Sequence, residues 1–75
     1  MEDAQNRNFE WFLQHYMEIY LLHGNCYVVI YEQRIVYVTK SFSNAVKYAN
    51  EHYEPGTFNV QHCNGDESGY TVTVF

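Results

Sequence analysis

Apolar side chains between residues 8 and 23 recur at the three- and four-residue spacing of one helical face. Asn8 can cap this helix, because its side-chain oxygen can accept a backbone N–H of the first turn. Gly24 suits the left-handed residue that follows a last turn, while Trp11, Ile19 and Leu22 make the apolar sector wider than one docking stripe requires. The pattern predicts a helix over 8–23, preceded by a flexible segment over 1–7. The expected inward face comprises Phe9, Phe12, Leu13, Tyr16, Met17 and Tyr20.

Two runs rich in β-branched and aromatic residues follow, over 26–31 and 34–39. Only Glu32 and Gln33 separate them, which predicts a β-hairpin. Tight two-residue turns favour Asn-Gly or Asp-Gly because their backbone takes positive φ, so either this turn is strained or Arg34 joins a three-residue loop. With the longer loop, one face carries Val28, Ile30, Val36 and Val38. The opposite face then carries Tyr27, Val29, Tyr31, Ile35 and Tyr37.

A second helix is predicted over 42–53, with Ser41 as its N-cap and Glu54-Pro55-Gly56 as its end. Its expected inward face holds Phe42, Ala45, Val46, Ala49 and Tyr53. Two strands, over 57–63 and 70–75, then flank a polar loop at 64–68. The residues expected in the core are Phe58, Val60, Val72 and Val74. Solvent is expected on the other face, which carries Thr57, Asn59, Gln61, Thr71 and Thr73.

The predicted order is therefore α-β-β-α-β-β, an α+β fold in one domain over 8–75. A chain of 75 residues is too short for a second core. The economical arrangement is a four-stranded, mainly antiparallel sheet with two helices laid across its one buried face.

Charge narrows the classes of partner. Four Lys and Arg residues stand against nine Asp and Glu residues, for a formal net charge of −5. These few cations cannot support nucleic-acid binding by counterion release, and we therefore expect no direct nucleic-acid partner.

The first residues, MEDAQNRN, resemble neither a secretory signal nor a transit peptide. The longest apolar run, over 26–31, is six residues, far short of a membrane span. A cytoplasmic protein with no membrane partner is expected.

Candidate chemistry is sparse. The chain has no CxxC or HxxxH pair, and His15 and His23 fall on different sides of the first helix, so neither a metal site nor a cofactor is predicted. No glycine-rich phosphate loop occurs, and a Cys–His nucleophile is less favoured than cysteine packed as a small hydrophobe. Because no export signal is seen, we expect the reducing cytoplasm, where cysteines stay as thiols. Cys26 and Cys63, with 36 residues between them, are therefore expected to be free. A disulfide would require the start of one strand to lie beside the end of the other. We predict no catalytic residue and no enzyme.

Tyrosine and acidic side chains are the candidate partner-binding residues. Tyrosine joins a large apolar area to a polar tip, which suits protein interfaces, and acidic side chains steer a protein toward a basic partner. The candidate set is Tyr27, Tyr31, Tyr37, Glu18, Asp66 and Glu67. Two alternatives for the tyrosines are burial under the first helix and a homodimer seam.

The stretches CYVVIYEQRIVYV and SFSNAVKYANEHYEPGTFNVQH resemble a hairpin-helix-strand pattern of small uncharacterised bacterial and phage proteins. Ser41, Ala45 and Ala49 carry its S-x-x-x-A-x-x-x-A helix. Several anti-CRISPR proteins are similar in size, acidity and build. The pattern covers residues 26–62 and departs at Glu32-Gln33, where such proteins often have Asn-Gly or Asp-Gly.

The resemblance implies a small binding protein encoded by a mobile element. Together with the acidity and the lack of catalytic motifs, it leads us to predict a non-enzymatic module that binds a larger host protein, such as a basic nucleic-acid-processing enzyme, as a phage-type inhibitor. The first alternative is a homodimeric structural or assembly subunit. A small metal-binding or enzymatic protein is the disfavoured alternative.

Overall fold

The structure, a computed structural model, describes residues 4–65. Its elements in chain order are helix α1 (Ala4–His23), strands β1 (Cys26–Tyr31) and β2 (Arg34–Thr39), helix α2 (Phe42–His52) and strand β3 (Phe58–Cys63). The strands form one antiparallel sheet in the order β2-β1-β3. This confirms the α+β class. The predicted fourth strand, 70–75, lies outside the described residues, as do Asp66 and Glu67.

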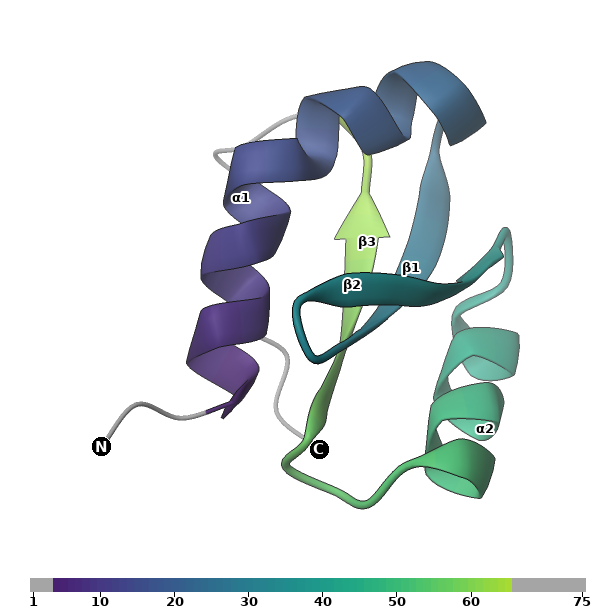
Figure 1. The fold of residues 1–75 in the computed structure, drawn as a ribbon. Coiled ribbons are helices and arrows are strands. Elements are labelled where there is room, and N and C mark those ends of the chain that lie inside the picture. Colours follow the sequence, from purple (N-terminus) through teal and green to yellow (C-terminus); the bar gives the residue numbers. More distant parts are fainter. Residues whose placement is uncertain (1–3, 66–75) are drawn as a thin grey trace.

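The two helices cover opposite faces of the sheet, with the strands between them (Figure 1). The expectation that both helices share one face was therefore wrong. Because successive side chains of a strand point to opposite faces, the wholly apolar β1 contributes to two separate cores. The core on the α1 side contains Phe12, Ile19, Cys26, Val28, Ile30 and Cys63. The core on the α2 side contains Val29, Ala45, Ala49, Phe58 and Val60.

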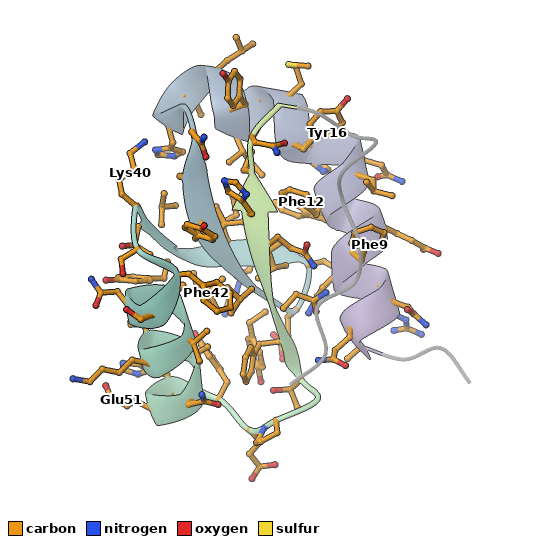
Figure 2. The ribbon with its side chains drawn as sticks, turned by 180° about the vertical axis from the view of Figure 1, so that it is seen from behind. Phe9, Phe12, Tyr16, Lys40, Phe42 and Glu51 are labelled. Atoms are coloured by element: carbon orange, nitrogen blue, oxygen red, sulfur yellow. The ribbon has the colours of Figure 1, made fainter. Side chains whose placement is uncertain are left out.

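Helix α1 begins at Ala4, so the predicted start at 8 was wrong, and Asn8 lies inside the helix rather than at its cap. Its buried residues are Gln5, Asn8, Phe12 and Ile19. Met17 and Tyr20, which we expected to face inward, are exposed. The first two inward positions are amides, so the spacing of apolar residues alone rotated the expected stripe away from the observed one, and the two stripes share Phe12 and Tyr16. Figure 2 shows Phe12 pointing from α1 toward β3.

The β1–β2 hairpin has the predicted strand bounds and combines both predicted registers. Next to the turn, Tyr31 pairs with Arg34, so the loop has two residues, Glu32 and Gln33, with φ of +52° and +59°. Farther along, Val29 pairs with Tyr37, and a register shift leaves Val36 without a direct partner. Such a bulge bends a strand and increases its twist, and Figure 1 shows β2 crossing steeply over the other strands.

The bulge decides the faces of the hairpin. Tyr27, Val29 and Tyr31 share the α2 side with Tyr37, as expected. Ile35 packs on the α1 side and Val36 on the α2 side, the reverse of the prediction, because one extra residue inverts the alternation.

The polar residues of β3 correct another expectation. Asn59 and Gln61 are buried, although we expected them to face solvent. Helix α1 covers that face of the strand, which a prediction based on alternation alone could not include. Phe58 and Val60 lie in the core, as predicted, but on the α2 side.

Helix α2 follows most of its sequence signals, although Phe42, which we expected to face inward, is exposed. The Ser41 Oγ accepts a hydrogen bond from the Asn44 N–H at 3.3 Å, which confirms the predicted N-cap. Ala45 and Ala49 are buried in the core. The residues expected in water are exposed: Ser43, Asn44, Lys47, Asn50 and Glu51. Within residues 4–65, no helix is long and apolar enough to cross a membrane.

Candidate protein-interaction site

The three candidate tyrosines lie beneath α2 and its flanks. The rings of Tyr31 and Tyr53 stack with centroids 4.2 Å apart, and those of Tyr37 and Tyr48 stack at the same separation. Tyr27 stacks on the exposed His62 at 4.6 Å. Tyr27 also contacts Phe42 of α2 edge-on at 5.6 Å, and all three candidate tyrosines are half-buried. The cover is therefore α2, not the first helix, and these rings hold α2 on the sheet.

Desolvation raises the pKa of the Tyr53 hydroxyl, and the neighbouring Tyr48 raises it further. An upward shift keeps this phenol neutral at pH 7.

The outward side of the last turns of α1 is apolar. The exposed fractions are 47% for Met17, 37% for Tyr20, 78% for Leu21 and 79% for Leu22. Residues three and four apart on a helix are neighbours, so Met17 adjoins both Tyr20 and Leu21, and Leu22 is four residues after Glu18. We call Met17, Tyr20, Leu21 and Leu22 the α1 terminal surface. Single exposed apolar residues are ordinary, but a contiguous group marks an interaction site.

Hydrogen bonds fix the end of α1. Gly24, at φ +70°, donates its N–H to the Tyr20 carbonyl at 2.7 Å, which closes the last turn. The Lys40 Nζ donates to the carbonyls of His23 and Asn25, each at 2.7 Å. Figure 2 shows Lys40 reaching toward this end of the helix. The α1 terminal surface is therefore held on a capped helix.

Tyr20 has an additional neighbour in the chain beyond β3. Gly65, at φ +79°, lies so close that a Cβ there would sit 3.2 Å from the Tyr20 ring. The glycine thus permits close approach of the backbone to the ring.

Glu18 is the candidate residue that the structure places beside the α1 terminal surface. It is exposed and follows Met17 in the helix. The nearby ammonium of Lys40 already binds two carbonyl groups. Of the four candidate residues that the structure describes, Glu18 alone lies at this surface, while the tyrosines pack against the core on the α2 side.

An open groove of about 520 Å³ lies at the start of α1 beside the β1–β2 turn. It is lined by Ala4, Arg7, Asn8, Tyr31, Glu32, Gln33 and Thr57. The Asn8 amide donates to the Ile30 carbonyl at 3.2 Å and accepts the Gln33 N–H at 2.9 Å. Asn8 therefore has a structural role, because it anchors the strained turn to the helix. In the part of the chain that the structure describes, no group of three or more His, Cys, Asp or Glu side chains could hold a metal ion.

Sequence reasoning missed Leu21 and placed Met17 and Tyr20 inward. A usable signal was present: six of the seven residues from 16 to 22 are apolar. A helix that packs on one side cannot bury apolar residues on every side, so some of them must remain exposed. No protein family model, no curated protein and no solved structure matches this chain.

Proposed function

We propose that this protein is a non-enzymatic binding module whose α1 terminal surface docks onto a larger, positively charged protein. The observation that carries this proposal is the exposure of Met17, Tyr20, Leu21 and Leu22 on a capped helix end. A few residues near the centre of an interface supply most of its binding free energy.

Charge supports a basic partner rather than an acidic one. The formal net charge is −5, and Glu18 adjoins the apolar group. A carboxylate at the edge of an apolar surface favours a partner that offers Lys or Arg beside an apolar recess, because complementary charges speed encounter and disfavour other partners. In the finer form of the proposal, the partner is a nucleic-acid-processing enzyme of a bacterial host. The protein then acts as an anti-CRISPR-like inhibitor that occludes it.

The test is a quantitative comparison of captured proteins by mass spectrometry. The baits are the natural chain, the double variant Leu21→Ser/Leu22→Ser and the matched control Lys47→Ser/Asn50→Ser, whose substitutions lie on the exposed side of α2. Truncating two interface anchors weakens binding by about 1–3 kcal/mol each. We therefore expect a basic protein that the natural and control baits retain and that the double variant loses at least about tenfold. Purified partner and bait should reproduce the loss by calorimetry.

Two outcomes would contradict the proposal. One is equal retention of the captured protein by the double variant. The other is a dimer of the natural chain in light scattering that the double variant converts to a monomer, which would assign the surface to the homodimer alternative. Both readings require that the double variant fold, and its exposed substitutions should shift the melting temperature by only a few degrees.

A further inference from the structure

The two cysteines meet across the sheet. Cys26 is the first residue of β1, Cys63 is the last residue of β3, and they are direct partners in the antiparallel register. The start of one strand thus lies beside the end of the other, the arrangement that a disulfide requires. Residues directly opposite in such a sheet have Cα atoms about 4.5–5.5 Å apart, within the span of about 4.4–6.8 Å that disulfides bridge.

Both thiols point to the same side of the sheet. They belong to one buried core with Phe12 and Val28, and both are free. The Cys63 Sγ donates a hydrogen bond to the Tyr16 carbonyl at 3.4 Å. Burial raises the pKa of the Cys26 thiol, and the neighbouring Cys63 raises it further. The Cys26 thiol is therefore protonated at pH 7, and because both cysteines are buried, their reaction requires transient opening of this end of the sheet.

We propose that Cys26 and Cys63 form an intramolecular disulfide site, oxidised by a small-molecule disulfide. One cysteine thiolate attacks the small disulfide, forms a mixed disulfide and expels a small thiolate. The second cysteine thiolate attacks the protein sulfur of that mixed disulfide and expels the second small thiolate. The protein loses two electrons and two protons, which convert the small disulfide into two thiols.

Oxidation should stabilise the fold. The new bond closes a loop with 36 residues between the cysteines, and such a bond restricts the unfolded chain more than the native one. The melting temperature of the oxidised protein should rise by roughly 10 °C. Reduction with dithiothreitol should reverse the rise.

The decisive measurement is the thiol–disulfide equilibrium of the natural chain with oxidised and reduced glutathione, in native buffer and in concentrated urea. Mass spectrometry after alkylation gives the oxidised fraction, and hence the effective concentration of one thiol at the other. If the native sheet holds the pair ready for bonding, this effective concentration is at least about 100-fold higher in native buffer than in urea. This comparison needs no variant.

A matched variant tests the register. Cys63→Ser combined with Gln61→Cys moves the thiol two residues along the same face, to a diagonal separation of about 7–8 Å. We expect the ratio of the effective concentration in native buffer to that in urea to fall at least about tenfold, provided that the variant melts cooperatively. The proposal is overturned if the natural chain shows no advantage over urea. It is equally overturned if the main product is a mixed glutathione adduct or a disulfide between two chains.

Discussion

On the α1 side of the sheet, the amides of Gln5, Asn8 and Asn59 are buried next to Phe12, whereas the α2 side packs Ala45 and Ala49 against Val29, Phe58 and Val60. Around these alanines, stacked rings join the sheet to α2 and its flanks. The α1 side thus combines apolar contacts with directional hydrogen bonds. The α2 side is held together by close packing of apolar side chains and by ring stacking.

The amides of the α1 side form a connected set of hydrogen bonds. The Gln5 Nε2 donates to the Phe58 carbonyl at 3.1 Å, and the Asn59 Nδ2 donates to the Gln5 carbonyl at 3.0 Å. The Asn8 Nδ2 donates to the Asn59 Oδ1 at 3.2 Å. Hydrogen bonds require particular distances and angles, so this set fixes the rotation of α1 and exposes Met17 and Leu21. Packing of small residues restricts the rotation of α2 less strongly.

The largest expected loss of stability is on the α2 side of the sheet, which is packed with apolar side chains. Val60→Asp buries an unpaired carboxylate among Val29, Phe58 and the α2 alanines. That burial costs several kcal/mol against a total stability of roughly 5 kcal/mol for a domain of this size. The variant should be unfolded at 25 °C by circular dichroism, while Asn50→Asp on the exposed side of α2 should fold. A cooperative melt close to that of the natural chain would show that the α2 side tolerates polarity.

A smaller loss of stability is expected on the α1 side of the sheet, where the buried amides lie. Asn8→Ala removes the donor to the Ile30 carbonyl and the acceptor of the Gln33 N–H. Leaving buried polar groups without partners should lower the free energy of unfolding by about 2–3 kcal/mol, measured by urea denaturation. Asn6→Ala, at an exposed position of the same helix, should change it by no more than about 0.5 kcal/mol. Equal effects of the two substitutions would mean that the amide contributes nothing through its hydrogen bonds.

The smallest effect has the opposite sign. Gln61 is buried on the α1 side, and its Nε2 has no hydrogen-bond partner among residues 4–65. Gln61→Leu removes this unsatisfied donor and should raise the free energy of unfolding by about 1 kcal/mol. Asn59→Leu, two residues earlier on the same face, breaks satisfied hydrogen bonds and should lower it. If both leucines destabilise equally, hydrogen-bond satisfaction is not what distinguishes the two amides.

Local signals in the sequence were enough for several elements. The β-branched runs predicted both hairpin strands at their observed bounds. Ser41 and the Glu54-Pro55-Gly56 stretch predicted the start of α2 and placed its end within one residue of the observed one. These signals act between residues close in the chain: a cap binds the next turn, and alternation describes a single strand.

The arrangement of these elements was decided only in the tertiary structure. A strand apolar on both faces, as β1 is, fits two helices on one side or one on each side, so its pattern could not place α1 and α2. The bulge at Val36 depends on the strain of the Glu32-Gln33 turn and on the pairing beyond it. The burial of Asn59 depends on Gln5, 54 residues earlier in the chain. Periodicity shows which side of an element is apolar, but contacts between distant residues decide what covers that side. For the same reason, the exposed end of α1 and the meeting of Cys26 with Cys63 became visible only in the folded chain.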